Sequence, residues 1–101
     1  MDERDRDWVD LVAMAAGEVE ATARLYDRHA PCMAAVAQAV ADAERAGDAV
    51  REAFGELRRR LTSYDSRLQG PIAAWLPRLA RERALAAIAG RQRLESEALT
   101  R

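Results

Sequence analysis

Apolar residues recur at three- and four-residue spacing in four separate stretches of this chain, and this pattern limits the fold more than any other feature. Such spacing places the apolar side chains on one face of an α-helix, whereas a half-buried strand would need a period of two. Alanine, the best helix former, is abundant, and the 101 residues include only 5 Gly and 3 Pro. The sequence therefore predicts an all-α fold, a compact bundle of about four helices.

Gly17 separates the first two predicted helices. The first covers roughly residues 7–16, and its apolar face consists of Trp8, Leu11, Val12 and Ala15. The second covers roughly residues 18–43, with an apolar face of Leu25, Tyr26, His29, Met33, Val36, Ala37 and Val40. Pro31 lies inside the second helix and has no backbone N–H, so we expect a kink or a division there. His29 is interpreted as a structural histidine and Cys32 as a small buried hydrophobe.

The third predicted helix starts near Asp48, whose carboxylate can cap the exposed N–H groups of the first turn. Its core face consists of Val50, Ala53, Phe54, Leu57 and Leu61. A polar loop covers roughly residues 62–70, and the fourth helix then runs to about Ala89 with Trp75 on its apolar face. We expect one domain over residues 8–90, a flexible acidic N-terminus over residues 1–7, and a linker stub or frayed tail over residues 91–101.

Charge is distributed unevenly along the chain. Residues 1–50 carry a net charge of −6 and residues 51–101 a net charge of +5, within a total of −1. An asymmetry of this size indicates that the second half meets an anionic partner, although solvated helix faces would also account for it.

Several classes of protein are disfavoured by what the sequence contains. With one His, one Cys and no glycine-rich phosphate loop, it offers no recognisable catalytic or metal-binding motif, so we expect neither an enzyme nor a cofactor or metal. The charged first residues do not resemble a signal peptide, and no apolar run approaches the roughly 20 residues of a membrane span. A lone thiol fits a reducing compartment, and we expect a cytoplasmic protein.

Two stretches favour binding. On the third helix, Asp48, Arg51, Glu52, Glu56 and Arg59 project away from the core face, which leaves a mixed-charge surface able to dock another charged helix; an ordinary solvated face is the alternative. After it, a polar loop containing Tyr64 precedes a helix that carries Arg78, Arg81 and Arg83. Arginines with neighbouring aromatic residues are a plausible platform for single-stranded nucleic acid.

Four blocks, in this order, resemble region 2 of extracytoplasmic-function (ECF) sigma factors. They are residues 11–17 (LVAMAAG) with 23–31 (ARLYDRHAP), 48–54 (DAVREAF), 64–65 (YD), and 70–76 (GPIAAWL) with 79–85 (LARERAL). They are similar, in turn, to the opening helix with its LYDRYAP stretch, the DVVQEVF block, the FDP loop, and the GSFRAWL and IARNRAL segments of the family. The resemblance covers the chain from about residue 8 to residue 94.

The resemblance implies a transcription-initiation domain. Docking on the clamp helices of the RNA polymerase beta-prime subunit would use Asp48, Arg51, Glu52 and Arg59. Capture of the single-stranded −10 promoter element would use Tyr64, Asp65, Ser66, Arg67, Leu68, Gln69, Arg78, Arg81 and Arg83. A flipped base loses a few kcal/mol of stacking, which contacts in a pocket must offset.

Two other hypotheses stay open. Ala73 stands where the family has an arginine, and the chain ends before any helix-turn-helix region. We therefore also consider a sigma-like interaction module that binds an anti-sigma factor or another regulator without initiating transcription. The third hypothesis is an unrelated helical bundle that self-associates. On either of the sigma-like hypotheses the chain is an excised domain or a stand-alone relative.

Overall fold

The structure is a computed structural model that describes residues 1–64 and 70–100, so residues 65–69 and 101 lie outside the described part. The described residues form four helices and no strand: α1 (Glu3–Ala15), α2 (Val19–Gln38), α3 (Ala43–Arg59) and α5 (Ile72–Leu99). This confirms the predicted all-α bundle of about four helices. None of the described helices combines the length and apolar character that crossing a membrane requires.

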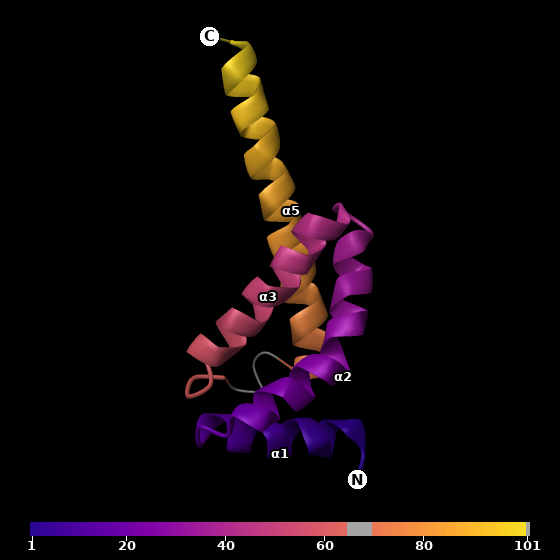
Figure 1. Ribbon diagram of the computed structural model, residues 1–101, viewed down its shortest axis with the longest axis vertical. Coiled ribbons are helices and arrows are strands. Elements are labelled where there is room, and N and C mark those ends of the chain that lie inside the picture. The colour runs from indigo at the N-terminus through magenta and orange to yellow at the C-terminus, as the bar shows by residue number, and fades with distance from the viewer. Residues whose placement is uncertain (65–69, 101) are drawn as a thin grey trace.

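The helices are arranged as a bundle with a long extension. Figure 1 shows α2, α3 and the first part of α5 alongside one another, with α1 across one end. The rest of α5 extends away from the bundle, so the C-terminus lies far from α1 and the molecule measures 55 × 25 × 24 Å. Helix α2 continues through Pro31 without interruption and bends along its course, which agrees with the expected kink and excludes the division.

The hydrophobic core lies where α2, α3 and α5 meet, and α1 contributes Leu11 and Met14 to it. Its largest fully buried side chains are those of Leu25, Met33, Leu57 and Leu76. Trp75 is also buried, as predicted from its position on the apolar face of the last helix. A second buried cluster, made only of alanines from the same three helices, consists of Ala37, Ala46, Ala49 and Ala84. Small side chains allow helix axes to approach closely, so this cluster suits close packing of the three helices.

Helix α1 contradicts the predicted start of the fold in two ways. It begins at Glu3, so most of the segment 1–7 that was expected to be flexible is helical, and Asp2 caps it by accepting a hydrogen bond from the Asp5 N–H at 2.9 Å. Its buried side is also different, because Trp8 and Val12 are exposed whereas Asp7 is buried. Leu11 of the predicted face is buried, and with Met14 it joins the core beside the aspartates that pair with α2, as described below.

Helix α3 begins six residues before the predicted start. Its cap is Asp42, which accepts a hydrogen bond from the Arg45 N–H at 2.9 Å, and Asp48 lies inside the helix. Burial of Ala46 and Ala49 against α2 and α5 offsets the roughly 1 kcal/mol by which Gly47 disfavours a helix. Conversely, α2 ends at Gln38, five residues before the predicted end.

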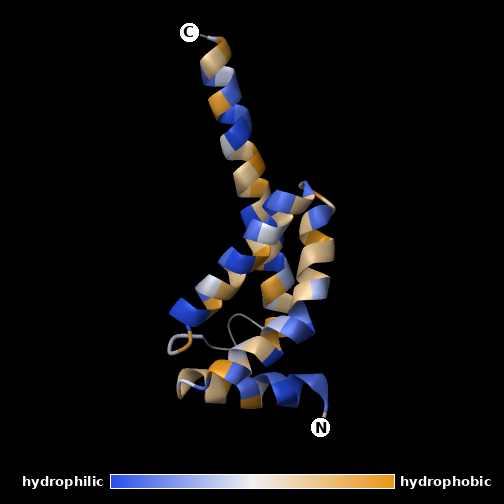
Figure 2. Ribbon diagram, in the orientation of Figure 1, coloured by the Kyte–Doolittle hydropathy of each residue, from blue (hydrophilic) through white to orange (hydrophobic). Residues whose placement is uncertain are grey.

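The last ten described residues were expected to be a linker stub or frayed tail, but they continue α5 as far as Leu99. Figure 2 shows hydrophilic residues interspersed with hydrophobic ones along this projecting part, where all residues over 91–100 are exposed. Good helix formers and the ion pair between Arg91 and Glu95 at 3.0 Å favour the helix, although none of its described side chains is buried.

Candidate functional site

The outer face of α3 carries the residues predicted to bind polymerase. Asp48, Arg51, Glu52 and Arg59 are all exposed, whereas Val50, Phe54 and Leu57 on the opposite side are buried. Asp48 and Arg51 form an ion pair one turn apart. Among the described residues, no cation pairs with Glu52. The face is therefore open to solvent and carries both signs of charge, as the sequence predicted.

Glu56 differs from its predicted position, because its side chain is only 13% exposed. Its carboxylate accepts hydrogen bonds from Arg59 at 2.6 Å and from Arg60 at 2.5 Å, and it lies 3.5 Å from Arg83 of α5. The hydrogen bonds from Arg59 and then Arg60 hold the pKa of Glu56 below its ordinary value. Glu56 thus ties α5 to α3 and partly neutralises three arginines, two of which were predicted to bind polymerase or DNA.

Tyr64 is the only predicted DNA-binding residue of the loop that the structure describes, because Asp65, Ser66, Arg67, Leu68 and Gln69 lie outside the described residues. Its hydroxyl donates a hydrogen bond to the Gly70 carbonyl, and its ring packs edge-on against Trp75 at 5.7 Å between centroids. Burial raises the pKa of Tyr64. Gly70 has a φ of 78°, which favours glycine at this position. These contacts hold the two ends of the loop together.

The three arginines predicted to bind DNA do not share one face of α5. Arg78 and Arg81 are exposed and lie one turn apart, and the positive charge of Arg78 acts to lower the pKa of the nearby Tyr64 hydroxyl. Arg83 lies on another side of the helix, half-buried and close to Glu56. The structure therefore brings Tyr64 and Arg78 together and directs Arg83 toward α3.

A pocket of about 450 Å³ lies beside Tyr64, at the described ends of the loop. Its walls include the apolar side chains of Trp8 and Leu11 from α1 and of Tyr64 and Ile72. Arg4 contributes a positive charge to the lining, and Asp5 and Asp7 contribute carboxylates. The sequence did not predict this pocket, because apolar spacing placed Trp8 in the core and the first seven residues were expected to be flexible. The available signal was Trp8, an aromatic residue that directly follows a strongly charged segment and could therefore have been expected near the surface.

A buried ion-pair network joins α1 to α2. Asp7 and Asp10 are each only 4% exposed. Arg28 bridges them, donating to Asp7 at 2.6 Å and to Asp10 at 2.9 Å, and Arg24 donates to Asp10 at 2.9 Å. Burial raises the pKa of Asp10, but the hydrogen bonds and charges of Arg24 and Arg28 lower it further, so its pKa lies below the ordinary value. The pairing satisfies both carboxylates, as buried charges require.

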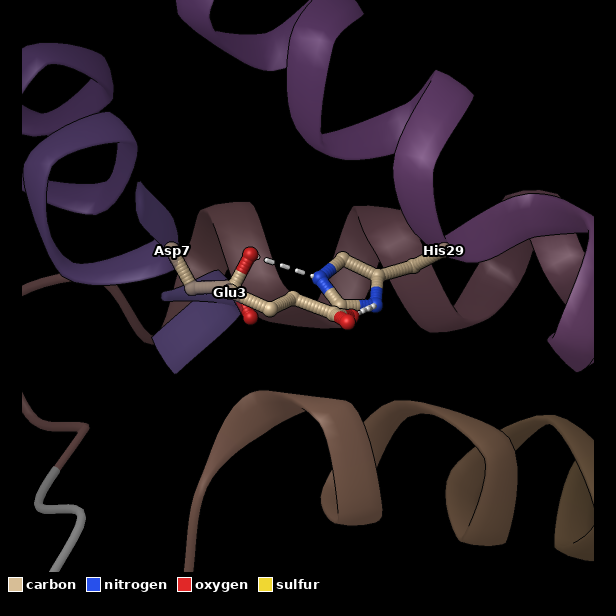
Figure 3. Close-up of side chains that lie close together, drawn as sticks. All are labelled: Glu3, Asp7 and His29. Atoms are coloured by element: carbon tan, nitrogen blue, oxygen red, sulfur yellow. Dashed lines mark hydrogen bonds and ion pairs between the residues drawn. The ribbon is translucent and has the colours of Figure 1, made fainter. Parts of the chain in front are cut away.

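His29 belongs to the same network, which confirms its interpretation as a structural histidine. Its Nε2 lies 2.8 Å from the Asp7 carboxylate, and its Nδ1 lies 3.9 Å from that of Glu3 (Figure 3). Cys32, by contrast, is exposed and not buried as predicted, because it lies beside the stripe of Leu25, His29 and Met33 that faces the core.

Glu3, Asp7 and His29 form the one group of potential metal ligands among the described residues, with ligand atoms within 4.8 Å of one another (Figure 3). The Asp7 oxygen nearest His29 also accepts the hydrogen bond from Arg28. A metal ion would have to compete with this guanidinium charge for the carboxylate. The group is therefore explained by ion pairing alone.

Comparison with known proteins adds no family assignment. No protein-family model, no curated protein and no solved structure matches the chain.

Proposed function

We propose that this chain is a transcription-initiation domain similar to region 2 of ECF sigma factors, which binds the core RNA polymerase and the single-stranded −10 promoter element in the cytoplasm. The observation that carries the proposal is the open outer face of α3, where Asp48, Arg51, Glu52 and Arg59 are exposed. These are the four residues that the family resemblance assigns to polymerase docking. The order of the four sequence blocks supports the same function.

In the docking half of the proposal, charged side chains of α3 give up their ion pairs with each other and pair with charged side chains of the polymerase clamp. The Asp48–Arg51 pair is exposed, with side chains 56% and 65% accessible, and pairs of this kind contribute at most about 1 kcal/mol. A charged helix of the polymerase clamp can replace such a pair at little cost. Oppositely charged groups on the clamp would then fix the register of the two helices.

The DNA half of the proposal uses the pocket beside Tyr64 and the first part of α5. The pocket between Trp8 and Tyr64 offers apolar walls on which an unstacked base can pack, and stacking on an aromatic side chain contributes about 1–3 kcal/mol per base. Arg78 and Arg81 are exposed on the adjoining helix, where they can contact phosphates. Arg83 contributes less, because Glu56 lies 3.5 Å from it.

The docking half is tested by binding to a purified clamp fragment of the polymerase beta-prime subunit. We expect the wild-type chain to bind and the double variant Asp48→Arg/Glu52→Arg to lose at least tenfold in affinity. The double variant Glu95→Arg/Glu97→Arg makes the same change of charge on the exposed end of α5 and is expected to bind normally. Absence of wild-type binding, or equal loss in both variants, would contradict docking through α3.

The DNA half is tested with a single-stranded oligonucleotide at several salt concentrations. Each phosphate contact adds about 0.7 to the slope of log affinity against log salt for single strands. We expect Arg78→Gln/Arg81→Gln to lower both the affinity and this slope, and Arg91→Gln/Arg93→Gln to change neither. Binding that does not respond to salt would remove this half of the proposal.

The interaction-module hypothesis is the second candidate, and the Glu56 contacts favour it. Arg59, Arg60 and Arg83 surround one carboxylate, which reduces the positive charge available to DNA. On this hypothesis an anti-sigma factor or another regulator binds the α3 face. A pull-down that recovers a regulator dependent on Asp48 and Glu52, together with no binding to polymerase, would favour it.

A further inference from the structure

Helix α1 packs on the bundle with a side that carries two apolar side chains, Leu11 and Met14, as well as two aspartates. The two aspartates of this side, Asp7 and Asp10, are buried against Arg24, Arg28 and His29 of α2. The apolar side chains of the opposite side consequently face solvent. Helix α1 therefore carries apolar side chains on two sides, of which only the side with Leu11 and Met14 is buried.

We define the outer face of α1 as Trp8, Val9, Val12, Ala15 and Ala16, all of which are exposed. Trp8 is 61% exposed, Val9 51% and Val12 53%. Single apolar residues on a surface are ordinary, but these residues lie next to one another at helical spacing and form one patch. Val19, the first residue of α2, is 81% exposed and follows the last residue of α1 by four positions in sequence. A contiguous exposed patch of this kind is typical of an interaction surface.

The charges around this patch restrict what can bind there. The exposed side chains over residues 2–6 and at 18 and 20 comprise five acidic and two basic groups. A nucleic acid would bring phosphates against this net negative charge. Of the outer face only Trp8, which also lines the pocket beside Tyr64, offers a ring for a base to stack on, whereas the valines at its centre do not. A second copy of the chain would bring an identical acidic border against it, since a two-fold interface joins the same surface of both copies.

The size of the patch gives a further restriction. Helix α1 has 13 residues and is therefore about 20 Å long. One face of such a helix cannot provide the roughly 1,200–2,000 Å² that a stable protein dimer buries. The patch suits a single helix that binds weakly and reversibly.

We propose that the outer face of α1 binds an amphipathic helix of another protein, one whose apolar ridge is flanked by lysines or arginines. The apolar ridge would cover Val9 and Val12, and the basic flanks would meet the acidic residues at the two ends of α1. This surface is on a different helix from the proposed polymerase-docking face. The proposal therefore does not depend on the function assigned to α3.

The experiment is a titration of the isotopically labelled full chain with a designed helical peptide that has a leucine ridge and lysine flanks. We expect micromolar affinity, shifts in the amide signals of Val9 and Val12 on binding, and weakening as salt is added. Val12→Ser should lower the affinity at least tenfold while the circular dichroism spectrum stays unchanged. Leu94→Ser, which changes a comparably exposed residue on α5, should bind the peptide as the wild type does.

The matched peptide carries glutamates in place of the lysines and should bind at least tenfold more weakly. Equal binding of the two peptides, or binding of neither, would overturn the proposal. So would a wild-type dimer that Val12→Ser dissociates, because the occupant would then be a second copy. Displacement of the lysine-flanked peptide by a single-stranded oligonucleotide, with the same shifts at Val9 and Val12, would instead identify a nucleic acid as the occupant and would also overturn it.

Discussion

The contact between α1 and α2 and the core between α2, α3 and α5 join helices by different chemistry. The core buries Leu25, Leu57 and Leu76 without directional bonds, so its contribution scales with apolar area and changes little with pH. The α1 contact combines the buried side chains of Leu11 and Met14 with an ion-pair network, in which arginines hold Asp7 and Asp10 at hydrogen-bonding distances. We infer that α1 can be released by conditions that leave the rest of the bundle folded. The following predictions test this difference, beginning with the largest effect.

Leu57→Ala should destabilise the whole bundle. Leu57 is fully buried in the core, and a leucine-to-alanine change at such a site costs roughly 3–5 kcal/mol through lost burial and the cavity left behind. Urea unfolding followed by circular dichroism measures the loss, and all four helices should unfold together. Leu99→Ala, at a leucine that is 89% exposed, is the matched control and should change stability by less than about 0.5 kcal/mol.

Arg28→Met should weaken the attachment of α1 specifically. The substitution leaves Asp7 and Asp10 buried without their shared partner, at a cost of about 2 kcal/mol; breaking a fully buried pair costs 3–5 kcal/mol, but Arg24 and His29 still contact the carboxylates here. Hydrogen exchange should show faster exchange in α1 and unchanged protection around Leu57. Uniform loss of protection in all four helices would show that the two interfaces are not separable.

Acid should destabilise the α1 contact before it affects the core. The pKa of Asp10 in the folded chain is below its ordinary value, so the contribution of Asp10 is present above about pH 4, the pKa range of an unfolded aspartate, and is lost as pH falls through the folded pKa. Asp42 and Glu56 also have lowered pKa values and add to the acid sensitivity of α3. Urea midpoints measured between pH 7 and pH 2 should fall less for Asp10→Asn than for the wild type. An identical fall in the two proteins would contradict this role of Asp10.

The smallest effect is expected outside both interfaces, at the start of α3. Asp42→Ala removes the cap that accepts from the Arg45 N–H and should cost about 1 kcal/mol. Asp48→Ala, which changes an exposed aspartate inside the same helix, should cost less than about 0.5 kcal/mol. Thermal unfolding of the two variants measures the difference. A larger effect at Asp48 would restore the helix start that the sequence predicted.

The sequence predicted the core better than the attachment of α1. The buried positions Val50, Phe54 and Leu57 recur at helical spacing in α3, and no competing set of residues fits the core face. In α1, apolar residues lie on two sides of the helix, so the sequence alone did not determine which side is buried. Periodicity selects the one with Trp8 and Val12, because it counts hydrophobicity and does not register that Asp7 and Asp10 meet Arg28 across a gap of about twenty residues in sequence.

The candidate site shows the same division. The exposure of Asp48, Arg51, Glu52 and Arg59 follows from the core face of α3 and could be predicted. The near-burial of the Glu56 side chain and its contact with Arg83 could not be predicted, since both depend on how α5 crosses α3. Local sequence patterns predict which side of a helix is exposed, whereas contacts between residues far apart in sequence can be identified only in the packed structure.

The extension of α5 has a consequence for how the chain melts. Beyond Gly90 every described side chain is exposed, and only Arg91, Gln92 and Glu95 border the turn between α2 and α3, so this part of the helix is held mainly by its own backbone bonds and by pairs such as Arg91–Glu95. Short helices held in this way unwind gradually with temperature. Helical ellipticity should therefore decline with a marked slope well below the cooperative transition, and removing residues 91–101 should flatten that slope without moving the transition midpoint.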